Sequence, residues 1–259
     1  MSLTPMISLH NVWFSYNGTP HAVLRDLSLT IPANSVTAIL GPNGSGKSTL
    51  LLILLGLLVP QQGEVFIADR RRDKYYQPAM GRLIGLVPQD EQFPIGLSAL
   101  EYVLLGRAPH LSILGRPAET DYQIALEALN LAGLIALKDR PVALMSDGER
   151  QLVTIARALA QRPRILLLDE PTSHLDLANT RHILRLLRDL AHEGVTIVFT
   201  THDPNAAAAA ADYAVLIKGG QIPAAGRVEE VFTDANLSQT YGIPVEITQL
   251  NGRPFVLAP

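Results

Sequence analysis

One octapeptide constrains the fold of this chain more than any other feature. Residues 41–48 read Gly-Pro-Asn-Gly-Ser-Gly-Lys-Ser and fit the pattern G-x-x-x-x-G-K-[ST]. The apolar run Val36–Leu40 precedes them, and Thr49–Leu58 follows as an expected buried helix. Glycines let a backbone wrap closely around a phosphate, and the start of a helix adds its positive dipole end. The sequence therefore predicts a phosphate-binding loop between a strand and a helix, in preference to a chance glycine turn.

The residues of this loop have separate expected roles. Lys47 should reach the β- and γ-phosphates of a nucleotide, and the hydroxyl of Ser48 should ligate Mg²⁺. We expect the nucleotide to be contacted by Gly41, Asn43, Gly44, Ser45, Gly46, Lys47, Ser48 and Thr49.

Short apolar runs elsewhere predict the rest of the sheet. Ile165–Leu168 and Val195–Thr200 are flanked by helical patterns, which is typical of parallel strands covered on both faces. A hairpin is expected at Val215–Ile222, around Gly219-Gly220. Further strands are expected at Ile7–Tyr16, with Trp13 in the core, and at Leu27–Ile31 and Glu64–Ala68.

A carboxylate pair follows one of these strands. Asp169 should enter the metal shell beside Ser48, and Glu170 could polarise an attacking water. A pair at a strand end is often only a helix cap, but the phosphate loop favours the catalytic interpretation.

A second helix start also suits a phosphate. Ser146 and Glu149 have the spacing of a capping box, which explains both residues without any ligand. The capping box does not explain Gly148, because glycine in the first turn destabilises a helix. Close approach of a second phosphate contact would explain it.

Composition excludes several classes of protein. The chain has 259 residues, 47% hydrophobic and 17% charged, so a disordered chain is excluded. It contains no cysteine, which excludes a disulfide scaffold and a thiolate metal site. A net charge of −3 argues against a nucleic-acid partner. The apolar run Leu50–Val59 is about half of what a membrane span needs, and no secretion signal is recognised, so any membrane link is expected to go through a partner.

Taken together, these motifs resemble the ATP-binding cassette of ABC transporters over nearly the whole chain. The further matches are the adenine-stacking aromatic residue (Tyr16), the Q-loop (Gln89), the signature motif (Ser146–Gln151), Walker B (Asp169-Glu170), the D-loop (Ser173–Asp176) and the switch histidine (His202). The signature departs from the family's Leu-Ser-Gly-Gly-Gln at Met145 and at Asp147, which either caps its helix or points away.

The resemblance implies roles for these residues. Glu170, His202 and Gln89 would be catalytic, and Ser48, Gln89 and Asp169 would hold Mg²⁺. ATP would be contacted by Tyr16 and by the residues of the loop. Four further contacts would come from Ser146, Gly148, Glu149 and Asp176.

The resemblance also implies the domain organisation. The family has an α/β P-loop NTPase core with a mainly parallel sheet, an N-terminal antiparallel β subdomain and an inserted α-helical signature subdomain. On that pattern, 1–259 is a single ABC ATPase domain. Residues 1–90 and 161–222 would form the core with its β subdomain, about 91–160 the helical subdomain, and 223–259 a C-terminal extension.

Two copies would associate head to tail with ATP between them, beneath two transmembrane permease subunits at the cytoplasmic face of the membrane. Gly106–His110 reads Gly-Arg-x-Pro-His, and Tyr241–Val245 reads Tyr-Gly-Ile-Pro-Val. Both resemble the ATPases of iron-siderophore, haem and cobalamin importers, which an extracytoplasmic binding protein supplies. The alternatives are a molybdate, other metal or unrelated cargo, a soluble ABC ATPase acting on DNA or ribosomes, and a simple turn at Gly106–His110.

Overall fold

The computed structural model describes residues 4–17, 21–112 and 115–257, which divide into two compact units. The first unit comprises Met1–Tyr75 and Leu187–Pro259, and the second comprises Tyr76–Leu186. The division falls within helix α6 (Leu177–His192).

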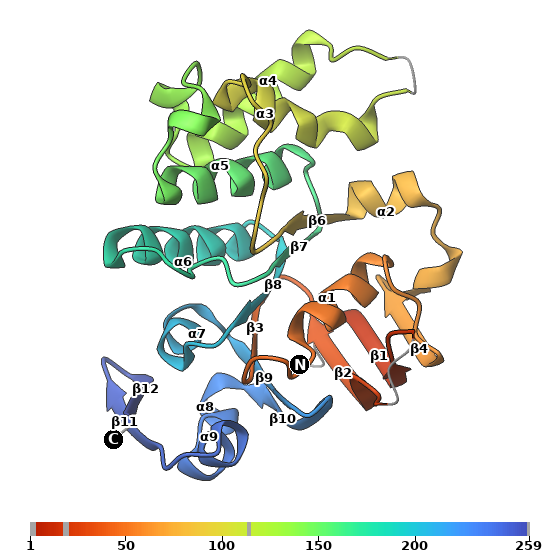
Figure 1. The fold of residues 1–259 in the computed structure, drawn as a ribbon, viewed down its shortest axis with the longest axis vertical. Helices are drawn as coiled ribbons and strands as arrows, with labels where there is room; N and C mark the ends of the chain where they lie inside the picture. The colour runs from red at the N-terminus through yellow and green to blue at the C-terminus, as the bar shows by residue number, and fades with distance from the viewer. Residues whose placement is uncertain (1–3, 18–20, 113–114, 258–259) are drawn as a thin grey trace. The chain divides into compact units, whose positions relative to one another are not determined.

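An antiparallel sheet opens the first unit (Figure 1). Its strand order is β2-β1-β4-β5. The bounds are β1 Pro5–Phe14, β2 Leu24–Pro32, β4 Gln62–Ile67 and β5 Arg70–Arg71.

The rest of the first unit contains a second set of paired strands, in the order β10-β9-β3-β8. β3 pairs in parallel with both β8 and β9, whereas β9 and β10 form an antiparallel hairpin, as expected around Gly219-Gly220. The bounds are β3 Val36–Leu40, α1 Lys47–Leu55, η1 Arg72–Lys74, β8 Thr196–Thr201, α7 Pro204–Ala210, β9 Tyr213–Lys218, β10 Gln221–Arg227, α8 Val228–Val231, α9 Asp234–Tyr241, β11 Glu246–Leu250 and β12 Arg253–Leu257.

Helices form most of the second unit, with α3, α4 and α5 packed together (Figure 1). Its strands β6 and β7 pair in parallel. The bounds are α2 Gln77–Leu83, β6 Ile84–Val87, α3 Ala99–Leu104, η2 Leu105–His110, α4 Glu119–Leu131, η3 Ile135–Leu137, η4 Val142–Leu144, α5 Asp147–Ala160 and β7 Ile165–Leu168.

Two local expectations were wrong. Helix α1 ends at Leu55 rather than Leu58, because Gly56 adopts a left-handed conformation (φ 78°) and its N–H bonds back to the last turn. Trp13 is 37% exposed, while its neighbours Val12 and Phe14 are buried. The β1–β2 and β1–β4 registers both shift next to Asn11, which has φ 50°, so the alternation of inward and outward side chains is broken there.

The domain boundaries inferred from the resemblance stay a prediction. Among the residues that the structure describes, no helix is long and apolar enough to cross a membrane.

Candidate functional site

The predicted phosphate loop lies between β3 and α1 in the first unit. Gly44 and Gly46 have φ values of 75° and 109°, which favour glycine. A Cβ on Gly41 would lie 2.1 Å from the carbonyl oxygen of Ile217 on β9. The loop conformation therefore depends on glycine at these positions.

Polar groups inside the loop suit an incoming polyphosphate. The buried Lys47 Nζ donates to the carbonyl oxygens of Gly41, at 2.8 Å, and Pro42, at 3.2 Å, so the amine lies across the loop. Ser45 Oγ is buried and has no hydrogen-bond partner among the described residues. The exposed Ser48 follows at the start of α1. A cation, an unsatisfied hydroxyl and a further accessible hydroxyl fit the phosphates of a nucleotide and an accompanying Mg²⁺.

Tyr16 is held next to the helix that follows the loop. Its hydroxyl lies 3.2 Å from Thr49 Oγ1 on α1, and its ring packs edge-on to Phe14 with the centroids 5.0 Å apart. The residue is 41% exposed, so a planar base could stack against it.

His202 lies at the same sheet edge as the phosphate loop. β3 and β8 run parallel, with Leu40 paired with Thr201, so the loop and His202 leave neighbouring strands at the same end. The side chain is exposed. The structure therefore places the predicted switch histidine beside the start of the loop.

In the second unit, Gln89 and the carboxylate pair Asp169-Glu170 also follow the ends of two neighbouring parallel strands. Val87 on β6 pairs with Leu168 on β7, and the Asp169 N–H donates to the Val87 oxygen at 2.9 Å. Both carboxylate residues are half-buried, and Gln89 is exposed.

The backbone bends sharply at the second carboxylate. Glu170 has φ 47°, an uncommon value for a residue with a side chain, and such outliers cluster at functional sites. Its carbonyl oxygen accepts hydrogen bonds from Ser173 N, at 3.1 Å, and Ser173 Oγ, at 2.9 Å. The bend is therefore fixed by the residues that follow it.

The signature segment forms the expected helix start at α5. Ser146 Oγ accepts from Glu149 N at 3.3 Å, and Ser146 N donates to Glu149 Oε2 at 2.8 Å. The backbone hydrogen bond from Ser146 lowers the pKa of Glu149 below its usual value. The capping box is thus confirmed, with Glu149 held as an anion.

Asn179, which sequence reasoning missed, explains Gly148 in this conformation. A Cβ on Gly148 would lie 2.4 Å from Asn179 Nδ2. Asn179 is in turn held by Asp176, whose Oδ1 accepts from Asn179 N at 2.8 Å and whose Oδ2 accepts from Asn179 Nδ2 at 3.1 Å. Asp176 therefore lies at the start of α6 and holds Asn179, the residue that packs on Gly148 of the signature motif.

Asp147 points away, because Ser146 and not Asp147 caps α5. Its side chain is 83% exposed and lies 3.8 Å from Arg150 Nη2.

We expect Asp147→Asn and Asp147→Gly each to change the free energy of unfolding by less than about 1 kcal/mol, since exposed ion pairs and one helix position contribute little. Urea unfolding of the two variants measures this. A larger loss, with Ser146→Ala as the positive control for a lost cap, would contradict the placement of Asp147.

The predicted site residues thus fall into two groups. The first unit holds Tyr16, Gly41, Asn43, Gly44, Ser45, Gly46, Lys47, Ser48, Thr49 and His202; the second holds Gln89, Ser146, Gly148, Glu149, Asp169, Glu170 and Asp176. Their roles toward the nucleotide stay predictions.

Comparisons with known proteins identify the relatives of this chain. The family model described as ABC transporter matches residues 24–173. The chain is 38% identical over 240 residues to the molybdate import ATP-binding protein MolC of Haemophilus influenzae, covering 92% of the chain and 89% of MolC. It is also 38% identical over 226 residues to the iron(3+)-hydroxamate import ATP-binding protein FhuC of Bacillus subtilis, covering 87% and 84%.

Solved structures confirm the predicted α/β fold class. A metal-chelate type ABC transporter in an inward-facing conformation superimposes with a TM-score of 0.85 at 36% identity, covering 98% of this chain and 96% of that one. A dimeric ATP-binding cassette bound to ADP and phosphate superimposes with a TM-score of 0.75 at 32% identity, covering 86% and 98%.

Proposed function

This chain belongs to the ABC transporter family of ATP-binding proteins, and from that premise we propose that it is the ATP-hydrolysing subunit of an importer for a metal chelate. The observation that carries the ATPase part is the phosphate loop, with Lys47 lying across it and Ser45 Oγ unsatisfied inside it. ATP binding would replace the carbonyl partners of Lys47 by phosphate oxygens, which are better partners for a cation.

We assign roles to the residues expected to contact the adenine, the phosphates, the attacking water and Mg²⁺. Tyr16 stacks on the adenine, and Lys47 with the loop N–H groups holds the β- and γ-phosphates. Glu170 orients and deprotonates the attacking water, while His202 donates to the γ-phosphate. By the resemblance, Ser48, Gln89 and Asp169 would hold Mg²⁺ through oxygen atoms of the kind that this ion prefers, and the ion would neutralise the phosphate charge when bound.

The site is completed by a second copy of the chain. By the resemblance, Ser146 and Gly148 at the start of α5 would contact a phosphate, although Asn179 packs on Gly148 in the isolated chain. Only the loop at 41–48 carries the lysine expected to bind the β- and γ-phosphates. Head-to-tail association would bring the α5 start of one copy to the ATP bound by the other. The dimeric state of the related cassette with ADP and phosphate supports this arrangement.

The cargo is proposed from the relatives. FhuC is named for iron(3+)-hydroxamate and the structural relative for a metal chelate, which supports a chelate importer. The extracytoplasmic binding protein of this proposal comes from the resemblance to the importer family. MolC is named for molybdate and is equally identical, so molybdate is the second candidate.

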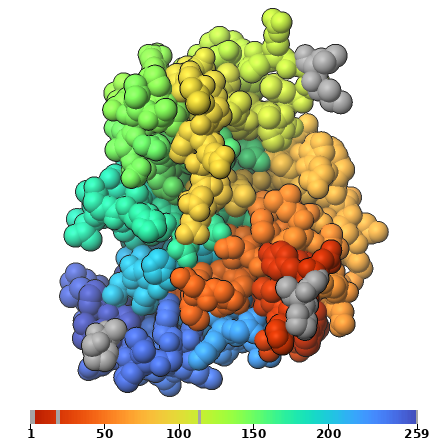
Figure 2. All heavy atoms as spheres, in the orientation of Figure 1, coloured from red at the N-terminus to blue at the C-terminus, as the bar shows by residue number. Residues whose placement is uncertain are grey.

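A groove in the second unit supports a permease partner. It has a volume of about 790 Å³ and lies between α2 and η2. Arg82 Nε donates to the Pro109 carbonyl oxygen at 2.8 Å and joins its two walls. Ile95, which is outside the groove lining, is 98% exposed. Figure 2 shows the chain around residue 100 in yellow on the visible face of the protein. We propose that a cytoplasmic helix of the permease lies in this groove. The lining residues are Tyr76, Gln77, Pro78, Gly81, Arg82, Ala108, Pro109, Leu111 and Ser112.

We expect Ala108→Glu to weaken association with the permease at least about tenfold, because it buries an unpaired carboxylate in a mainly apolar contact. Ala108 is exposed in the isolated chain, so the variant should keep its melting temperature. Co-purification of the tagged chain with the permease measures the effect. Ala136→Glu, exposed on η3 and outside the groove, is the matched control, and equal loss in both variants would reject the groove as the contact.

Transport itself is tested by reconstitution. The chain is co-expressed with the permease encoded beside it, and vesicles are assayed for ATP-driven uptake of ferric siderophore, haem, cobalamin and molybdate. Uptake of a chelate supports the proposal, uptake of molybdate alone favours the second candidate, and ATP-driven efflux would overturn import while leaving the ATPase function intact.

A further inference from the structure

The C-terminal segment is bonded to the helix that follows His202. Asn205 on α7 exchanges two hydrogen bonds with the backbone of Val256 on β12, Asn205 Nδ2 to O at 3.0 Å and Val256 N to Asn205 Oδ1 at 2.8 Å. Arg253 Nη1 donates to the carbonyl oxygens of Ala208, at 2.9 Å, and Ala209, at 2.8 Å, near the end of the same helix. β12 therefore lies along α7 in the first unit (Figure 1) and fixes it at both ends.

A second contact reaches His202 directly. The hydroxyl of Tyr241, the last residue of α9, donates to the His202 carbonyl oxygen at 3.3 Å. Burial, with the nearby Asp203 carboxylate adding to it, raises the pKa of Tyr241 well above its usual value. The phenol therefore remains a hydrogen-bond donor at every pH at which the protein would work.

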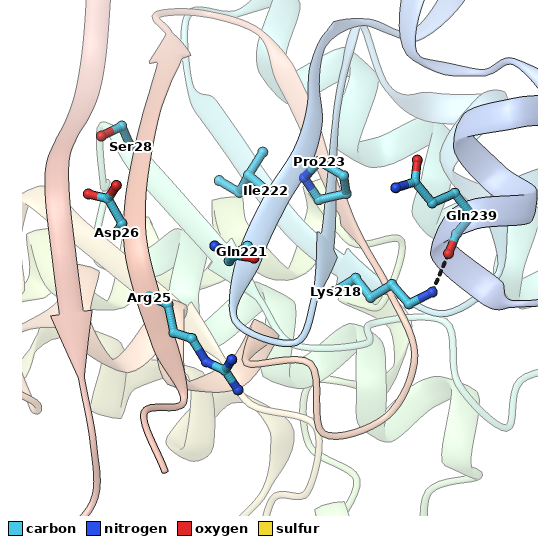
Figure 3. A pocket seen from close by; sticks show the side chains of 8 residues that line it. All are labelled: Arg25, Asp26, Ser28, Lys218, Gln221, Ile222, Pro223 and Gln239. Atoms are coloured by element: carbon cyan, nitrogen blue, oxygen red, sulfur yellow. Dashed lines mark hydrogen bonds between the residues drawn. The ribbon is translucent and has the colours of Figure 1, made fainter.

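Helix α9 is itself held in place from both sides. Thr233 Oγ1 accepts from Asn236 N at its start, and Lys218 Nζ on β9 donates to the Gln239 carbonyl oxygen in its last turn. Figure 3 shows Lys218 reaching across to α9 from the hairpin, at one side of a hollow of about 480 Å³.

The same hairpin contacts the phosphate loop. Gly220 N donates to the Ser45 carbonyl oxygen at 3.2 Å, and a Cβ on Gly220 would lie 2.2 Å from the Val23 oxygen. A chain of hydrogen bonds thus runs from the phosphate loop through the hairpin and α9 to the backbone of His202. The last of these bonds, from the Tyr241 hydroxyl to the His202 carbonyl oxygen, can fix the His202 backbone relative to the phosphate loop.

We propose that Tyr241 is a positioning residue for His202: by fixing the carbonyl of His202, its hydroxyl sets the direction in which the imidazole leaves β8. This inference rests on the proposed role of His202 at the γ-phosphate. It also gives a physical reason for the Tyr-Gly-Ile-Pro-Val tail. Gly242 ends α9 with φ 76°, and Val245 N donates to Ser238 Oγ at 2.9 Å, so the tail holds Tyr241 at the end of a fixed helix.

The test compares Tyr241→Phe with Tyr75→Phe. Tyr75 lies in the same unit and also donates its hydroxyl to a carbonyl oxygen, that of Ile67 at 2.8 Å, so both variants lose one bond of the same kind. We expect Tyr241→Phe to lower kcat for ATP hydrolysis about fivefold, the factor that corresponds to about 1 kcal/mol, with the KM for ATP unchanged. Tyr75→Phe should keep the wild-type kcat, and both variants should melt at similar temperatures.

A double variant separates positioning from other effects. In a His202→Ala background the residual kcat should be the same with and without the Tyr241→Phe substitution, because the group being positioned is gone. An unchanged kcat in Tyr241→Phe, or the same loss in the His202→Ala background, would overturn the inference. Wild-type turnover in His202→Ala alone would instead refute the role proposed for His202, so the two failures are distinguishable.

Discussion

Glu170→Gln should hydrolyse ATP at least about 10²-fold more slowly than the wild type while still binding the nucleotide. Glutamine keeps the shape of the side chain but removes the charge and basicity that a water-activating group needs. The backbone at this position is held by the two hydrogen bonds that the Glu170 carbonyl accepts from Ser173, and neither bond involves the carboxylate. The substitution should therefore retain these two backbone hydrogen bonds while it changes the chemistry of the side chain.

Three measurements check this expectation. Steady-state hydrolysis at saturating ATP gives kcat, titration with a fluorescent ATP analogue gives affinity, and gel filtration with ATP detects the trapped dimer expected when hydrolysis is blocked. Glu193→Gln, an exposed carboxylate just after α6, is the matched control and should behave as wild type. Near-normal turnover in Glu170→Gln would refute the role assigned to Glu170, whatever the affinity for ATP.

Asp121→Asn should lower the free energy of unfolding by about 3 kcal/mol, because it breaks a buried ion pair and leaves Arg107 uncompensated. The two side chains are 7% and 10% exposed, and Arg107 Nε donates to Asp121 Oδ1 at 2.8 Å. Asp121 Oδ2 accepts from Ala118 N at 2.9 Å. Asparagine has one acceptor oxygen for these two donors, so one donor would face an NH₂ group.

Chemical denaturation measures the loss, with Glu127→Gln as the control. Glu127 forms an ion pair of the same length, 2.8 Å, with Arg162, but the two side chains are 63% and 60% exposed. This control should lose less than about 1 kcal/mol. Replacing both buried partners, in Arg107→Met/Asp121→Leu, should restore part of the stability. Equal losses of unfolding free energy in Asp121→Asn and Glu127→Gln would contradict the expectation that the buried ion pair contributes more to stability than the exposed one.

The same pair predicts a pH dependence. The hydrogen bond from Arg107, followed by that from Ala118, lowers the pKa of Asp121 below its ordinary value of 3.8. A carboxylate with a lowered pKa in the folded state contributes stability that is fully present above the unfolded-state pKa and is lost as the pH falls through the folded-state pKa. The stability difference between wild type and Asp121→Asn should therefore be constant above about pH 5 and shrink below about pH 4. A difference that stays constant down to about pH 2 would contradict this account.

The Gly-Arg-x-Pro-His motif at Gly106–His110 could be recognised in the sequence, but the contacts that its residues make could not be predicted. Arg107 is not a surface residue for a partner: besides Asp121 it bonds the Ala160 carbonyl oxygen at 2.7 Å. A Cβ on Gly106 would lie 2.0 Å from the Arg157 oxygen. The segment thus holds η2 against α5, and Ala108 and Pro109 are left to line the groove.

What the sequence by itself determined lies within short stretches of chain. The bounds of β3 and β7, the glycines of the phosphate loop, the hairpin at Gly219-Gly220 and the capping box of Ser146 and Glu149 were all predicted, because each depends on residues a few positions apart.

Only the tertiary structure decided the contacts between distant residues. Asn179 beside Gly148, Asp121 beside Arg107 and Tyr241 on the His202 carbonyl are each joined by the fold and not by spacing. Trp13 became exposed because a bulge at Asn11, set by two neighbouring strands, broke the alternation along β1. Backbone conformation follows from local sterics, whereas the partner of a buried charge or a glycine depends on which elements pack together, and packing is settled only when the whole chain has folded.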